Sequence, residues 1–131
     1  GELLKEKYKN TKIYFLGAIF NKEELDTFRF FAKYYLHGHS VGGTNPALIE
    51  AMAASAFVII HDNPFNKSVV SSNNYSFANK EQLIELLENE KILSDREKIA
   101  DENIAIINHS YRWEKIVDQY ENYFLRILNK K

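Results

Sequence analysis

Short apolar runs alternate with amphipathic segments along the first part of the chain. Residues of the types common in strands form compact runs at 13–16, 34–37 and 57–60, and a shorter run lies at 75–77. Between these runs, the residues that follow Asn21 and those at 46–54 place apolar side chains at helical spacing. The alternation predicts an α/β fold, in which right-handed crossovers connect the strands of a parallel sheet.

Polar residues mark the expected starts of several helices. An N-cap side chain followed three residues later by Glu or Gln is typical of a capping box. Three pairs of this kind are Asn21 with Glu24, Asn79 with Gln82, and Ser94 with Glu97. Asn45 precedes Pro46, which predicts an N-cap with proline at the first helical position.

The last predicted helix, about residues 111–128, has a continuous apolar stripe. The stripe consists of Trp113, Ile116, Val117, Tyr120, Phe124 and Ile127. A stripe at helical spacing normally packs against a core, so core packing is the expected role of all these side chains.

Composition limits the classes of protein to consider. At 131 residues with a hydrophobic fraction of 45%, the chain is large enough to fold as one domain around its own core. Lys and Arg number 17 against 18 Asp and Glu, so the basic surface expected of a nucleic-acid binder is missing. The lack of cysteine excludes disulfides and thiolate metal sites. No apolar run reaches the roughly 18 residues that a membrane span needs. The opening GELLKEKY, without Met, indicates a helix tail cut from a longer protein.

The most unusual stretch is HGHSVGGTNPALIEAM, which begins at His37. In open parallel sheets, ligands bind outside the carboxyl ends of the strands, where the loops after the predicted strands should meet. Gly42 and Gly43 permit positive φ angles or a close approach to the backbone, and the helix start after them offers free N–H groups. The pattern favours an anion site, most commonly for a diphosphate, although the common glycine fingerprints of nucleotide sites are absent. A simple tight turn is the alternative.

Glu50 is the single charge on the helix that follows this loop. Its neighbours on the same helical face are small and apolar, so it does not belong to a solvated charged face. Helical side chains lean toward the helix N-terminus, and the carboxylate is therefore expected to point at the anion site. Beside a phosphate, a carboxylate can still accept hydrogen bonds from hydroxyl groups of the same ligand, such as the diol of a ribose. The alternative is a buried glutamate paired with Lys or Arg.

Two histidines, His37 and His39, alternate at the end of the second predicted strand. With His61 and Asp62 on the next loop they could be drawn as a metal site, but no zinc-type spacing supports one. A histidine that donates a hydrogen bond to a phosphate oxygen is the better interpretation. Turn and cap roles are the simple expectation for Asp62, Asn63 and Asn66.

Three segments together carry a family resemblance: LHGHSVGGTNPALIEAMA, then HDNPFN one strand later, and YRWEKIVDQYENYF near the end. They resemble the donor-binding, C-terminal half of family 4 glycosyltransferases with the GT-B fold. Within that family they are most similar to the rhamnosyltransferase-type enzymes with which bacteria build surface polysaccharides. The resemblance implies a Rossmann-like three-layer parallel sheet within residues 1–131. It also implies that the helix at about 111–128 packs back toward an N-terminal half outside this chain.

The resemblance implies a function as well. Such enzymes transfer a sugar, here one such as rhamnose, from a nucleoside diphosphate sugar to a glycan or lipid-linked acceptor. They retain the anomeric configuration and use no metal or cofactor, because the helix N-terminus and basic side chains stabilise the diphosphate leaving group. The donor would be a dTDP- or UDP-sugar. The catalytic and acceptor-binding residues would lie in the N-terminal half, so the fragment alone is expected to be inactive.

The resemblance also assigns site residues by position. Glu50 matches the glutamate that contacts the donor ribose. The residues expected at the diphosphate and donor sugar are Gly42, Gly43, Thr44, Asn45, His39 and, less directly, His37. The residues expected along the base pocket, mainly through their backbone groups, are Gly17, Ala18 and Ile19. Gly42 stands where the family has another glutamate, the one near the donor sugar. This chain therefore lacks the carboxylate that usually contacts the sugar.

Two other classes stay open. Nucleotide-sugar 2-epimerases have a similar two-domain fold and would differ in the N-terminal half. A flavodoxin-like signalling module, which binds a partner protein, would carry acids at the strand ends, and IYFLG at 13–17 has none. For the transferase, the resemblance implies a cytoplasmic location in a bacterium and no nucleic-acid partner. Because acceptors of the family are often lipid-linked, it also admits peripheral association of the longer protein with the inner face of the membrane.

Overall fold

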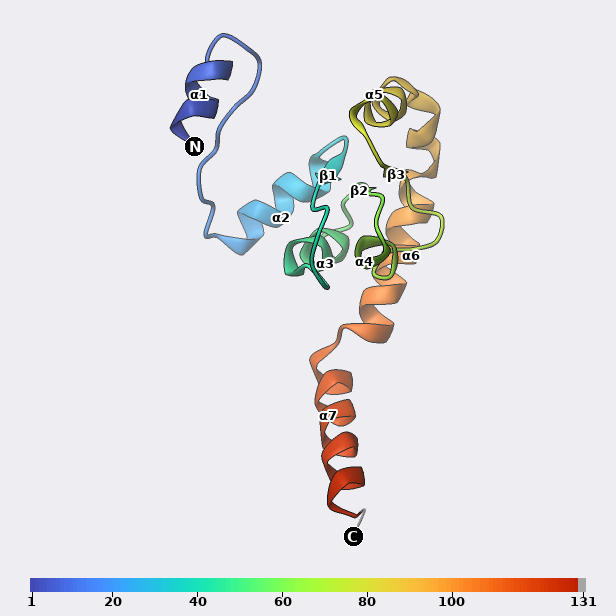
Figure 1. The fold of residues 1–131 in the computed structure, drawn as a ribbon. Coiled ribbons are helices and arrows are strands. Elements are labelled where there is room, and N and C mark those ends of the chain that lie inside the picture. Colours follow the sequence, from blue (N-terminus) through green and yellow to red (C-terminus); the bar gives the residue numbers. More distant parts are fainter. Residues whose placement is uncertain (130–131) are drawn as a thin grey trace.

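The computed structural model describes residues 1–129 (Figure 1). Its strands are β1 (Tyr35–His37), β2 (Val58–His61) and β3 (Ser76–Phe77). Its α-helices are α1 (Glu2–Tyr8), α2 (Lys22–Phe31), α3 (Pro46–Ala53), α4 (Pro64–Lys67), α5 (Lys80–Glu88), α6 (Arg96–Ser110) and α7 (Trp113–Leu128). A 3-10 helix, η1 (Glu90–Asp95), joins α5 to α6.

The three strands form one small parallel sheet in the order β1-β2-β3. Leu36 lies opposite Ile59 across the first pair, and Ile60 lies opposite Ser76 across the second. The predicted α/β class is thus confirmed. Each strand begins one residue later than its apolar run, and β2 extends as far as His61. Because the strands run in the same direction, the loops after His37 and His61 leave from the same edge of the sheet.

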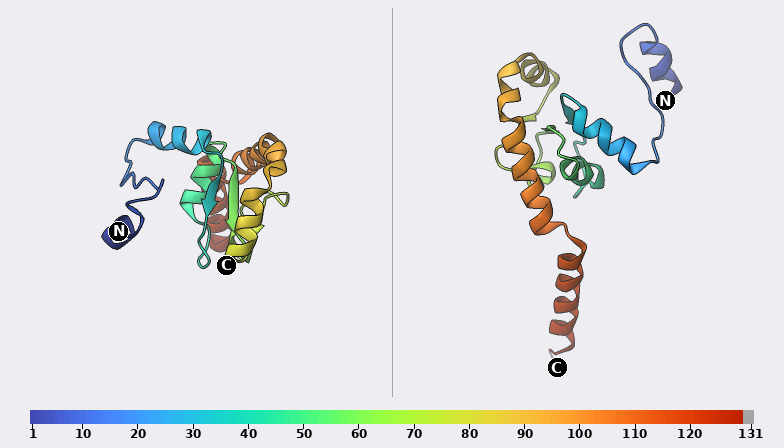
Figure 2. Two further views of the ribbon diagram at one scale, coloured as in Figure 1. Left: turned by 90° about the horizontal axis from the view of Figure 1, so that it is seen from above. Right: turned by 180° about the vertical axis from the view of Figure 1, so that it is seen from behind.

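Two apolar clusters cover the opposite faces of β2, because successive side chains of a strand point to opposite sides. One cluster buries Val58 and Ile60 against α3, and the other buries Phe57 and Ile59 against the region from β3 to α6. The helix α6 reaches both clusters, and it runs along the body in both views of Figure 2. A parallel strand buried on both faces is what the continuous apolar run at 57–60 predicts.

The strand predicted at residues 13–16 does not form. These residues lie in an irregular segment between α1 and α2, which runs apart from the sheet in Figure 1. Their side chains are exposed, with Tyr14 reaching 84%. Strand propensity describes how well a side chain fits a paired and partly buried strand, and it does not supply the pairing itself. The prediction was wrong because it rested on composition without a partner strand.

The predicted helix starts divide into three that are confirmed and one that is wrong. The side chains of Asn21, Asn45 and Asn79 each accept a hydrogen bond from a backbone N–H in the first turn, at 2.9 to 3.0 Å. Ser94 instead lies inside η1, where its Oγ donates to the carbonyl of Lys91 at 2.7 Å. Because η1 leads directly into α6, there is no free helix start at Ser94 for a cap to satisfy.

The helix α7 extends away from the body, as the views in Figures 1 and 2 agree. Its apolar stripe is largely exposed, with exposed fractions of 78% for Trp113, 62% for Tyr120 and 57% for Phe124. The expectation that this stripe packs into a core is therefore wrong within the described residues. A helix buries its stripe only where another element lies opposite, and none covers these side chains here.

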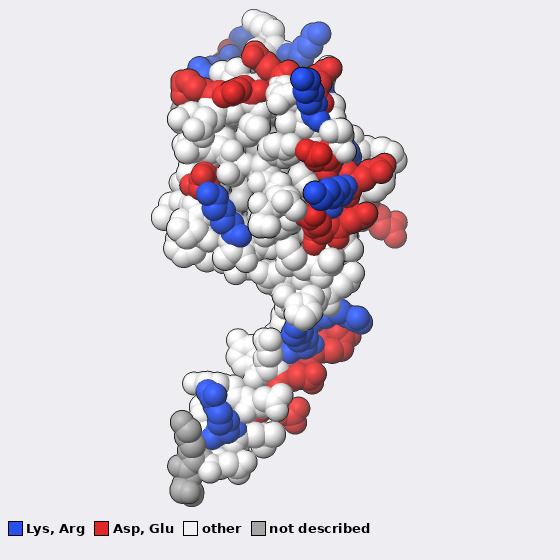
Figure 3. Space-filling view, turned by 90° about the vertical axis from the view of Figure 1, so that its right-hand side faces the viewer, with Lys and Arg blue, Asp and Glu red and all other residues white. Residues whose placement is uncertain are grey.

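Charged side chains of both signs are mixed on the face shown in Figure 3, over the body and along α7. This matches the nearly balanced charge of the whole sequence, whose formal net value is -1. Among the helices described between residues 1 and 129, none combines the length and apolar character needed to cross a membrane.

Candidate functional site

The candidate site is built around the loop between β1 and α3. Asn45 caps α3 by accepting a hydrogen bond from the N–H of Ala47 at 2.9 Å, and Pro46 occupies the first turn, as predicted. Gly42 has a φ of +116°, a conformation that side chains rarely tolerate. The positive φ accounts for glycine at position 42, in a bend over residues 41–43. A Cβ atom at Gly43 would meet open space, so Gly43 leaves its backbone accessible from outside.

Backbone donors along this whole loop are left without partners, since no N–H group from His39 to Asn45 donates a hydrogen bond within the described residues. Among the described residues, the N–H groups of Gly43, Thr44 and Asn45 donate no hydrogen bond. Within α3 itself, the N–H of Ala47 is bonded to the Asn45 side chain, and those of Leu48 and Ile49 bond to the carbonyl of Asn45 at 3.1 and 3.3 Å. Gly43 and Thr44 are exposed. Unpaired donors directly before a helix are suited to an anion, because the helix dipole adds to them.

His37 and His39 stack at the carboxyl end of β1, with ring centroids 4.6 Å apart and planes 20° apart. His37 is buried at 2% exposure, and its Nε2 has no hydrogen-bond partner among the described residues. Burial lowers the pKa of His37, and the neighbouring His39 lowers it further. The inner ring is therefore held neutral, while His39 lies at the surface.

Two asparagines tie this loop to the end of β2. The Nδ2 atoms of Asn63 and Asn66 both donate to the carbonyl oxygen of His39, each at 2.9 Å. Asn66 also donates to the carbonyl of His61 at 3.0 Å, and Asn63 caps α4. The cap role was predicted for Asn63, but the link between the two loops was not. Its signal in the sequence is the pair of asparagines in HDNPFN.

Asp62 has a separate local role. Its Oδ1 forms an ion pair with Nζ of Lys67 at 2.7 Å, on the surface of α4. In the part of the chain that the structure describes, no three His, Asp or Glu side chains are arranged to hold a metal ion. Asp62 is therefore a surface residue next to the site.

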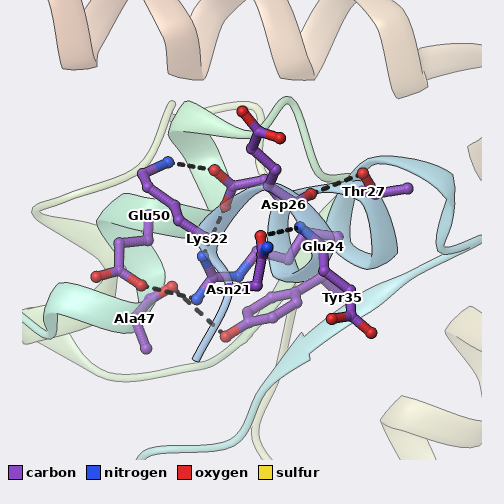
Figure 4. A network of polar contacts seen from close by, with 10 residues as sticks. Asn21, Lys22, Glu24, Asp26, Thr27, Tyr35, Ala47 and Glu50 are labelled. Atoms are coloured by element: carbon purple, nitrogen blue, oxygen red, sulfur yellow. Dashed lines mark hydrogen bonds and ion pairs between the residues drawn. The ribbon is translucent and has the colours of Figure 1, made fainter. Parts of the chain in front are cut away.

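Glu50 is paired with an arginine of α2. Nη2 of Arg29 donates to Oε2 of Glu50 at 2.8 Å, and Nη1 of Arg29 donates to Oδ1 of Asp26 at 3.0 Å. Figure 4 shows this network between α2 and α3, in which Lys22 also bonds to Asp26. The alternative of a glutamate paired with Lys or Arg is therefore observed, but Glu50 is not buried, since 52% of its side chain is exposed.

Arg29 was missed by the sequence analysis. Its side chain is only 7% exposed, and it lies 21 residues before Glu50. Burial disfavours the charged guanidinium, yet its hydrogen bonds to Glu50 and Asp26 outweigh that effect and raise the pKa of Arg29. The one signal in the sequence is a lone cation among the aromatic residues of FRFF.

The segment predicted to line the base pocket is not a loop that leaves a sheet strand. Gly17 and Ala18 are exposed and Ile19 is half-buried, all in the irregular segment that leads into α2. The other predicted residues lie on β1, on the loop that follows it and on α3. His37, His39 and residues 42–45 lie in one connection, and Glu50 follows on the helix that this connection starts.

Comparisons of the chain with protein-family models, with curated proteins and with solved structures found no match. The geometry of the site itself indicates its chemistry. That geometry combines unpaired backbone donors, a neutral buried histidine beside an exposed one, and a half-exposed carboxylate held by an arginine.

Proposed function

We propose that this chain is the donor-binding domain of a retaining glycosyltransferase and binds a nucleoside diphosphate sugar. In this proposal its small parallel sheet is the core of a Rossmann-like domain of the GT-B type. The observation that carries it is the pairing of two features on one connection. Unpaired N–H groups at Gly43, Thr44 and Asn45 suit a diphosphate, and Glu50 follows on α3 with a half-exposed carboxylate.

The two features suit different parts of one ligand. A diphosphate needs donors, and the loop that leads into α3 supplies them without a basic side chain. A carboxylate would repel the diphosphate and is useful beside it only for hydroxyl groups, which the ribose provides. His39 is exposed in this loop and can donate to a phosphate or sugar oxygen. Its ring stacks on the ring of the neutral, buried His37.

The rest of the reaction is assigned to other parts of a longer protein. The proposal places the catalytic groups and the glycan or lipid-linked acceptor on an N-terminal domain. The exposed stripe of α7 supports a covering element of that kind, because its aromatic side chains are left without one here. Contact of the base with the backbone of Gly17, Ala18 and Ile19 stays a prediction.

A thermal-shift panel tests the proposal. The chain is melted with deoxythymidine, uridine, guanosine and adenosine diphosphates, beside Glu50→Ala and the control Glu121→Ala, an exposed carboxylate on α7. A ligand at about a hundred times its dissociation constant should add roughly 2.7 kcal/mol of stability. We expect a shift with one base that Glu50→Ala loses and Glu121→Ala keeps. A shift that Glu50→Ala retains in full would count against the ribose role, and no shift with any base would overturn the proposal for this chain.

A further inference from the structure

Arg29 is a buried cation that the proposed function does not use directly. Its guanidinium bonds through its two terminal nitrogens, Nη2 to Glu50 and Nη1 to Asp26, and its Nε is buried without a partner among the described residues. A buried charge is strongly disfavoured unless it is paired. The position of the guanidinium is therefore fixed by these two carboxylates and by the protein around it.

The bond from Arg29 determines how Glu50 is presented. Arg29 is 7% exposed and Glu50 is 52% exposed, so the contact runs from the interior to the surface. It occupies Oε2 of Glu50, whereas Oε1 has no hydrogen bond among the described residues. An unpaired surface glutamate would sample several rotamers. In Glu50, Arg29 instead holds Oε2, while Oε1 stays available to a ligand.

At the Asp26 end of the same network, the ion pair lies at the surface. Asp26 accepts a hydrogen bond from Nη1 of Arg29 and also forms an ion pair with Lys22, whose side chain is 81% exposed. An exposed ion pair contributes little to structure, whereas a buried one fixes its partners. Lys22 is therefore a matched control for Arg29. It is a cation on the same helix and in the same network, but it does not contact Glu50.

We propose that Arg29 is the positioning residue for Glu50, because it holds Oε2 and presents Oε1, which has no partner among the described residues, to accept a hydrogen bond from the ribose. This inference rests on the proposed function. Arg29 itself touches no ligand, because the bond to Oε2 and the burial of its side chain turn it away from solvent. Its contribution reaches the ligand only through the orientation of Glu50.

Calorimetric titration of the folded chain tests this role. The probe is whichever of the four nucleoside diphosphates stabilises the wild-type chain most. A hydrogen bond to a charged group is worth about tenfold or more in affinity. We expect Glu50→Ala and Arg29→Met each to weaken binding by about tenfold, and the double variant to lose no more than Glu50→Ala alone, because Arg29 acts on the ligand only through Glu50. Lys22→Met should leave the affinity unchanged.

Each other outcome is decisive. A purely structural Arg29 would lower the melting temperature but leave the dissociation constant of the folded chain unchanged, which would overturn the inference and spare the proposed function. Losses that multiply in the double variant, or an equal loss in Lys22→Met, would also overturn it. Arg29→Lys, which keeps the charge, provides a folded variant if Arg29→Met does not fold, and it should still bind more weakly because lysine lacks the planar fork. Absence of binding to the wild-type chain would overturn the proposed function and the inference together.

Discussion

Asn103 shows how one buried polar side chain can hold three segments together. It has no exposed surface, its Oδ1 accepts from the N–H of Ser71 at 2.9 Å, and its Nδ2 donates to Oδ1 of Asn74 at 2.9 Å. Asn74 in turn donates to the carbonyl of Val58 at 2.8 Å. The side chain of Asn103 thus connects α6, the loop before β3 and strand β2.

Replacing this side chain is expected to destabilise the fold. Asn103→Leu leaves the buried N–H of Ser71 unpaired, which should lower the free energy of unfolding by about 1–3 kcal/mol. Denaturant unfolding measures this loss, with Asn108→Leu, an exposed asparagine of the same helix, as the control. Equal effects of the two substitutions would show that the buried network contributes nothing of its own.

The buried ring of His37 predicts a dependence of stability on pH. Desolvation lowers the pKa of His37 below its ordinary value of 6.5, and His39 contributes in the same direction. Between the lowered pKa and 6.5 the unfolded chain binds more protons than the folded chain, so the free energy of unfolding falls as the pH drops through this window. The neutral His37 contributes its full stability above that window.

Unfolding curves at several pH values check this prediction. His37→Leu should flatten the dependence of stability on pH below 6.5, because the group that titrates is gone. His39→Gln removes an exposed ring and should keep most of the slope. An unchanged slope in His37→Leu would assign the pH dependence to other groups.

Among the elements, the helix caps offer a direct comparison of two asparagines. Asn45 caps α3 at the candidate site and Asn79 caps α5 away from it. Replacement of either by alanine should cost about 1 kcal/mol of stability. In the proposed function only Asn45→Ala should also reduce the thermal shift caused by the nucleoside diphosphate, because it loosens the loop that supplies the backbone donors. Equal ligand-induced thermal shifts in the two variants would show that the cap of α3 does not contribute to ligand binding.

Local patterns predicted the elements well where one segment contains the whole interaction. An asparagine cap and its N–H partner lie within three residues, and three such caps were found from sequence. The strand at 13–16 failed because a strand needs a partner elsewhere in the chain. Ser94 failed because its pattern could not reveal that η1 precedes α6.

The same distinction applies to the candidate site. The predicted strand order placed the site residues at the end of the second predicted strand and after it, and His37 does end β1, with His39 and residues 42–45 in the loop that follows. The contact of Arg29 with Glu50 spans 21 residues, and the bonds of Asn63 and Asn66 to His39 span 24 and 27. No local pattern encodes such contacts, because they depend on how whole elements pack.

At the scale of the whole molecule, the exposed side chains of the α7 stripe are expected to contribute little to the free energy of unfolding. Tyr120 and Phe124 are 62% and 57% exposed, whereas Ile99 in α6 is 2% exposed. Tyr120→Ala and Phe124→Ala should each change the free energy of unfolding by less than about 0.5 kcal/mol. Ile99→Ala should cost about 2–5 kcal/mol, because it leaves a cavity in the core.

Denaturant unfolding at low protein concentration distinguishes a free helix from a covered one. If α7 extends from the body as in Figure 1, the body unfolds at the same denaturant concentration with or without the two aromatic rings. A loss of several kcal/mol in Tyr120→Ala or Phe124→Ala would mean that these rings are buried in solution. A loss that grows with protein concentration would identify a second copy of the chain as the cover, since association stabilises by mass action. A loss independent of concentration would mean that α7 folds back onto its own body.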